Sequence, residues 1–180
     1  MLKKMRGFTL IELLIVVAII GILAALLIPN ALSAIQKAKQ KGTMKDINSI
    51  ATAMVDFITD NGTAPVHDGT LVAGDQLYLD LSGFYLKVLP TNDQWGSPFL
   101  VYGQSAAVMG SGYGITESAD DEFIITSWGR DKADGPTFTF DPLDPALSYF
   151  PITGLISFNQ DLVNWSGSWI HAPKSAQLGS

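Results

Sequence analysis

The chain begins with a short basic segment followed by a long apolar run. Residues 1–7 contain Lys3, Lys4 and Arg6, and the twenty-one residues 8–28 are interrupted by a single charge, Glu12. As a helix, residues 8–28 would be about 31 Å long, which matches the roughly 30 Å hydrocarbon core of a bilayer. The pattern predicts one membrane-spanning helix with a cytoplasmic N-terminus, because basic residues flank the cytoplasmic end.

From residue 29 to residue 61 the pattern becomes amphipathic. Apolar side chains now recur mostly at intervals of three and four: Leu32, Ile35, Ile47, Ile50, Ala51, Met54, Phe57 and Ile58. This spacing predicts that the helix continues beyond the membrane with one apolar face. Pro29 and Gly42 are helix breakers and predict a kink or local melting, while Asn61-Gly62 predicts the end of the helix.

Residues 62–171 predict a globular domain of loops and antiparallel strands. The segment 63–82 has the composition of a connector with a short helical turn at 76–81, and strand patterns follow at 99–102 and 122–127 around a glycine-rich span at 110–114. Prolines make residues 136–155 an irregular excursion, and 172–180 are expected to be a flexible tail. The predicted fold class is α+β, a long N-terminal helix packed on a small antiparallel sheet.

Charge is distributed unevenly along the chain. The formal net charge is -6, yet seven of the eleven basic residues precede residue 46, where Glu12 is the one acidic residue. The remaining body is therefore strongly acidic, which argues against nucleic acid as the primary partner, since phosphates need a basic face. The chain contains no cysteine, which excludes disulfides and thiol chemistry.

Glu12 is costly in a membrane span, where a carboxylate is disfavoured by about 2.5–3.5 kcal/mol on insertion scales. One explanation is a carboxylate that reaches the nearby membrane face. The other is a cationic partner: cleavage after Gly7 would give Phe8 a free amine, with which Glu12 of a neighbouring subunit could pair. A secretory signal peptide is disfavoured because its apolar region is usually only 7 to 15 residues long.

The segment KKMRGFTLIELLIVV at residues 3–17 resembles the processing signal of type IV prepilins and pseudopilins. The resemblance implies a type IV pilin-like fold and processing by a membrane prepilin peptidase and methyltransferase. Gly7 would be the last residue of the leader, Phe8 the N-methylated terminus of the mature chain, and Glu12 the carboxylate used in assembly.

Three segments of the body resemble the major pseudopilin of type II secretion systems: LPTNDQWGSPF at 89–99, SWGRD at 127–131 and NQDLVNW at 159–165. In the first, Asp93 is expected to cap a turn and Gly96 to take positive φ. The other two imply a structural Ca²⁺ site with Asp131, Asn159 and Asp161 as ligands and Asp134 as a weaker candidate. Asn159 departs from the family pattern, in which a carboxylate is usual.

These resemblances imply a structural subunit of a type II secretion pseudopilus that drives export of folded proteins. Its expected partners are copies of itself in a helical homopolymer, minor pseudopilins and the inner-membrane assembly platform. We expect a single-pass protein of the bacterial inner membrane with a periplasmic globular domain. His67 and His171 are isolated and no nucleophile set can be assembled, so we do not expect an enzyme. A type IV pilus major pilin, or a membrane-anchored periplasmic binding or enzyme domain, are the alternatives.

Overall fold

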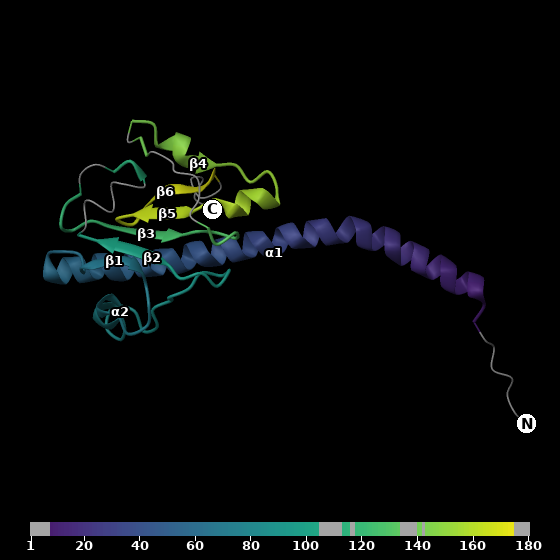
Figure 1. Cartoon of the computed structure of the whole chain (residues 1–180), viewed down its shortest axis with the longest axis horizontal. Helices are drawn as coiled ribbons and strands as arrows, with labels where there is room; N and C mark the ends of the chain where they lie inside the picture. Colours follow the sequence, from purple (N-terminus) through teal and green to yellow (C-terminus); the bar gives the residue numbers. More distant parts are fainter. Residues whose placement is uncertain (1–7, 105–112, 116–117, 134–139, 142, 175–180) are drawn as a thin grey trace, which may run out of the picture. The chain divides into compact units, whose positions relative to one another are not determined.

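The computed structural model describes residues 8–104, 113–115, 118–133, 140–141 and 143–174 (Figure 1). The chain divides into two compact units, Met1–Gln36 and Lys37–Ser180. One helix, α1 (Leu10–Asn61), has residues in both units.

The apolar side chains of the first unit are solvent-exposed in the isolated chain. Large hydrophobic residues between Phe8 and Ile28 are 46–83% exposed. By length and composition this part of α1 is able to cross a membrane, as the sequence predicts. An apolar surface of this length, broken by the single charge of Glu12, requires a lipid or protein environment.

Neither Pro29 nor Gly42 interrupts α1, so the expectation of local melting is wrong. The packing of Gln94 explains why position 42 is a glycine within a continuous helix. A Cβ atom there would lie 2.9 Å from Cγ of Gln94, so the absent side chain leaves room for Gln94 against the helix. The predicted helix end is confirmed, because Gly62 follows α1 with φ +81° and donates its N–H to the carbonyl of Ile58.

The second unit contains a six-stranded sheet in the order β1-β2-β3-β5-β6-β4 (Figure 1). The strands are β1 (His67–Thr70), β2 (Leu100–Gly103), β3 (Phe123–Ser127), β4 (Tyr149–Phe150), β5 (Leu162–Trp165) and β6 (Ser168–Pro173). All neighbouring strands are antiparallel except β4 and β6, which pair in parallel. A short helix, α2 (Gln76–Leu81), and two 3-10 helices, η1 (Pro145–Ser148) and η2 (Leu155–Asn159), complete the unit.

The core of the second unit lies between α1 and one face of the sheet. Ile47, Ile50 and Met54 of α1 are fully buried in one cluster with Phe123 and Ile125 of β3. The intervening residue of β3, Ile124, belongs to a second cluster, because successive side chains of a strand point to opposite faces. The predicted fold class, a long helix packed on a small and mostly antiparallel sheet, is confirmed.

Three details of the prediction are wrong. The connector 63–82 contains β1, which pairs with β2, and the excursion 136–155 contains the short strand β4. The tail was expected from Ala172, but Ala172 is fully buried and pairs with Tyr149. Of the glycine-rich span, residues 110–112 lie outside the described residues, and Tyr113 and Gly114 are not in a strand.

Candidate functional site

The N-terminus of α1 is closed by reciprocal hydrogen bonds between Thr9 and Glu12. Thr9 donates to Oε2 of Glu12 from its backbone N–H (2.9 Å) and from its hydroxyl group (2.7 Å), and the Glu12 N–H donates to Oγ1 of Thr9 (3.3 Å). This arrangement is a capping box, in which two residues three apart satisfy backbone donors at a helix start. A negative charge is also favoured here by the helix dipole.

The capping box, which contains the predicted assembly carboxylate of Glu12, directly follows the predicted processing site in the sequence. Phe8 immediately precedes Thr9 and is 83% exposed, while Gly7 lies outside the described residues. Thr9 supplies hydrogen bonds that Glu12 would otherwise lack in an apolar environment. If cleavage after Gly7 gave Phe8 a free amine, that amine would either displace Thr9 from the Glu12 carboxylate or bind the carboxylate in addition to Thr9.

The turn at residues 89–99 is organised by one buried carboxyl group. Asp93 is 5% exposed; its Oδ1 accepts hydrogen bonds from the backbone N–H groups of Trp95 and Ser97, each at 2.9 Å. Its Oδ2 accepts from the hydroxyl group of Ser127 at 2.7 Å. The predicted capping role of Asp93 is confirmed, as is the positive φ of Gly96 (+84°).

The segments 127–131 and 159–165 also meet, as the resemblance implies. The backbone N–H of Arg130 donates to the carbonyl of Phe158 at 2.8 Å. Gly129 has φ +73°, and a Cβ atom there would lie 2.8 Å from the carbonyl oxygens of both Phe158 and Gln160. Only glycine fits this close approach of two backbones. Together with the hydrogen bond from Ser127 to Asp93, these contacts join the three segments 89–99, 127–131 and 159–165.

The structure describes three of the four candidate calcium ligands, Asp131, Asn159 and Asp161. Asn159 Oδ1 accepts a hydrogen bond from Nε of Arg130 (3.1 Å), a cationic group that would repel a metal ion. Asp131 is exposed, Asp161 is buried, and Asp134 lies outside the described residues. Among the residues that the structure describes, no group of three or more His, Cys, Asp or Glu side chains could hold a metal ion. Calcium binding stays a prediction of the resemblance.

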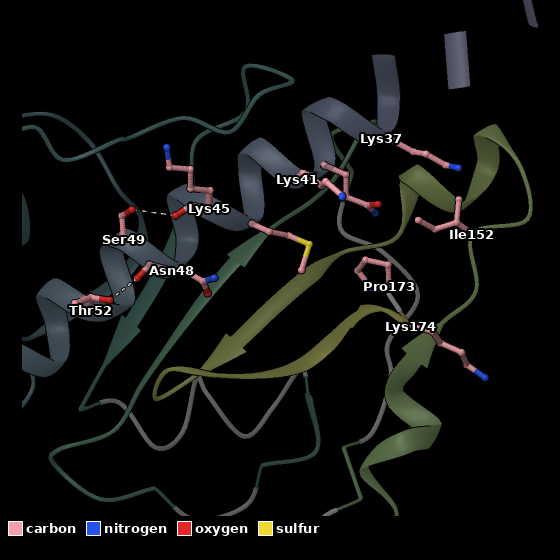
Figure 2. Close-up of a pocket in the computed structure, with 11 residues that line it drawn as sticks. Lys37, Lys41, Lys45, Asn48, Ser49, Thr52, Ile152, Pro173 and Lys174 are labelled. Carbon is pink, nitrogen blue, oxygen red and sulfur yellow. Dashed lines mark hydrogen bonds between the residues drawn. The ribbon is translucent and has the colours of Figure 1, made fainter. Parts of the chain in front are cut away.

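Two charged surfaces of the second unit were not predicted from the sequence. A groove of 720 Å³ lies between α1 and residues near β6 (Figure 2). Its lining includes four lysines: Lys37, Lys41, Lys45 and Lys174. A hollow of 310 Å³ farther along α1 is lined by Asp56, Thr59, Asp60, Phe84 and Tyr85. Lysines four residues apart on a helix were the available sequence signal for the groove.

Comparison with known proteins identifies the family. Residues 2–28 match the family model described as the prokaryotic N-terminal methylation motif. The type II secretion system core protein G of Aeromonas hydrophila is 31% identical over 137 residues, covering 70% of this chain and 94% of the relative. That of Escherichia coli (strain K12) is 31% identical over 138 residues, covering 72% and 94%.

The core protein G of Pseudomonas aeruginosa is 38% identical over 104 residues, covering 54% of this chain and 72% of the relative. No solved structure matches this chain at a significant level. The match covers nearly the whole length of the Aeromonas and Escherichia relatives and about three quarters of the Pseudomonas relative. The chain belongs to the family of the type II secretion system core protein G, the major pseudopilin.

Proposed function

We propose that this chain is the structural subunit of a type II secretion pseudopilus. It is cleaved after Gly7, N-methylated at Phe8 and assembled into a helical filament. The observation that carries the proposal is the apolar surface of α1 before Pro29, at least 46% exposed at every large side chain, in a chain related to core protein G. Lipid covers this surface before assembly, and the same segments of neighbouring subunits cover it within the filament.

In this scheme the subunit waits in the inner membrane with its globular domain in the periplasm. Minor pseudopilins, the assembly platform and the prepilin peptidase are its partners. The role is structural, and filament growth moves folded proteins outward. Because the membrane anchor and the filament core are the same surface, no large apolar area is exposed to water during assembly.

Glu12 has a specific role in this proposal. Inside the filament its carboxylate pairs with the methylated amine of Phe8 on a neighbouring subunit. A buried charge without a partner is strongly unfavourable, so the pair sets the axial register of subunits as well as their affinity. The Thr9 hydrogen bonds keep the carboxylate satisfied until the neighbour arrives.

The test is a pair of substitutions at the two predicted positions. Glu12→Ala should leave membrane insertion and leader cleavage intact but reduce filament formation at least tenfold, measured by shearing and sedimentation. Gly7→Leu should block cleavage and leave a slower-migrating precursor in the membrane. Mass spectrometry of the wild-type N-terminus should find methylated Phe8. Normal filament yield from Glu12→Ala, or an uncleaved wild-type chain, would overturn the proposal.

A further inference from the structure

The lysine-lined groove on α1 carries positive charge that forms no ion pair with the part of the subunit that the structure describes. Figure 2 shows the groove between α1 and the segments that hold Ile152 and Pro173. Lys37, Lys41 and Lys45 are exposed, and none of them forms an ion pair with any residue that the structure describes. Their spacing of four residues places like charges on one side of the helix, an unfavourable arrangement that nearby carboxylates would relieve.

The floor of this basic groove is apolar enough to accept more than an ion. Its lining includes Met44, Ile152 and Pro173 beside the lysines. A fitting partner therefore presents carboxylates together with an exposed apolar side chain.

The hollow near the end of α1, which we term the acidic patch, has this chemistry. Asp56 and Asp60 are exposed and four residues apart, and neither forms an ion pair with the described part of the chain. The Tyr85 hydroxyl group donates to Asp60 Oδ2 at 3.0 Å, which holds the ring beside the carboxylate. Phe84 packs edge-on against Tyr85 at 4.8 Å between ring centroids, yet is 81% exposed.

The two surfaces also match in spacing along α1. Lys41 and Asp56 are fifteen residues apart, and so are Lys45 and Asp60. A single displacement of one subunit along the helix axis by about 22 Å, at 1.5 Å per residue, therefore brings both pairs to the same height. Because the groove and the patch are different surfaces of one molecule, their contact is heterologous and generates an open helical polymer.

We propose that the basic groove binds the acidic patch of a second copy of this chain. The inference rests on the proposed function, because a filament supplies parallel copies at fixed axial offsets. It adds an ion-pair contact between globular domains to the apolar contact of the membrane segments. Phe84 of one copy enters the groove over Met44 of the next, and the lysines meet Asp56 and Asp60.

Charge reversal and charge exchange in the full-length chain test the contact. Lys41→Glu and Asp56→Lys should each reduce sheared filament yield at least fivefold, and a chain with both substitutions should recover to within twofold of wild type. Lys132→Glu and Asp121→Lys alter exposed charges elsewhere and should assemble normally. Filaments of normal yield from either groove or patch variant, or no recovery in the exchanged chain, would refute the proposal.

Cross-linking provides a second readout that does not depend on charge reversal. Because the chain has no cysteine, Lys45→Cys and Asp60→Cys can be expressed together as separate subunits and treated within filaments with a short bis-maleimide cross-linker, which spans the length of a Lys–Asp pair. A covalent dimer is expected from this pair, and none from Lys132→Cys with Asp60→Cys. Filaments that contain both cysteine subunits but give no dimer would reject this contact alone, whereas a wild-type chain that forms no filament would reject the proposed function. Loss of binding to vesicles of anionic lipid by Lys41→Glu, without recovery in the exchanged chain, would assign the groove to a membrane and also overturn the proposal.

Discussion

Asp93 should be the most important single polar residue for the stability of the globular domain. Asp93→Ala removes the acceptor of three hydrogen bonds and leaves the donors of Trp95, Ser97 and Ser127 facing a space that excludes water. Each buried bond contributes about 0.5–1.5 kcal/mol net, and a donor left unsatisfied costs about 1–3 kcal/mol. We therefore expect a loss of about 4 kcal/mol in the free energy of unfolding.

The assay is thermal unfolding of the full chain in detergent, followed by near-UV circular dichroism. For a domain of this size 1 kcal/mol shifts Tm by about 2–4 °C, so Asp93→Ala should lower Tm by about 12 °C. Asp93→Asn is the matched variant. Its oxygen can still accept from the two backbone donors, and the Ser127 hydroxyl group can reverse its role and accept, so a loss of about 1–2 kcal/mol is expected. A Tm for Asp93→Ala within 3 °C of wild type would contradict this reasoning.

Two further predictions concern stability. Gly129→Ala places a Cβ atom 2.8 Å from two carbonyl oxygens at φ +73°, whereas Gly74→Ala meets no atom within 4 Å at φ +99°. We expect about 2–4 kcal/mol of destabilisation for the first and about 1–2 kcal/mol for the second in urea unfolding; equal losses would contradict the backbone contact. Burial lowers the pKa of His171 below its ordinary value of 6.5, partly opposed by a hydrogen bond with the Ser148 backbone. The unfolded chain therefore binds more protons below pH 6.5, so the His171 contribution is complete above that pH and is lost as the pH falls through the folded-state pKa. A His171→Gln variant should show a flatter decline of Tm between pH 7 and 5, and parallel curves would exclude this group.

The sequence predicted the parts of the fold that have a strong internal pattern. The apolar run and the three-to-four spacing of Ile47, Ile50 and Met54 indicated α1. Strand β1 could not be found this way, since His67-Asp68-Gly69-Thr70 has no alternation of apolar residues and is held by backbone pairing with β2. The β5 to β6 hairpin did have a signal. Ser166 and Gly167 both take positive φ in its turn, and Ser-Gly is a typical turn pair.

The candidate sites also differ in whether the sequence carries a signal for them. The resemblance implied that segments 127–131 and 159–165 meet, and Gly129 lies at their contact. It did not predict the hydrogen bond from Ser127 to Asp93. The resemblance did not predict that Asn159 Oδ1 accepts a hydrogen bond from Arg130, because this bond depends on local side-chain geometry. The basic groove was missed for a different reason: Lys45 and Lys174 are far apart in sequence, and only the packing of β6 near α1 joins them.

The hydrogen bond from Arg130 to Phe158 makes the fold tolerant of changes in the length of the chain between these two residues. Because this bond and the close packing at Gly129 hold Arg130 and Phe158 together, lengthening the chain between them adds only a loop-closure entropy, which grows slowly with length. Doubling such a loop costs only about 0.6 kcal/mol. Leu143 is 94% exposed, so an epitope inserted beside it would lengthen the loop without disturbing the anchored ends.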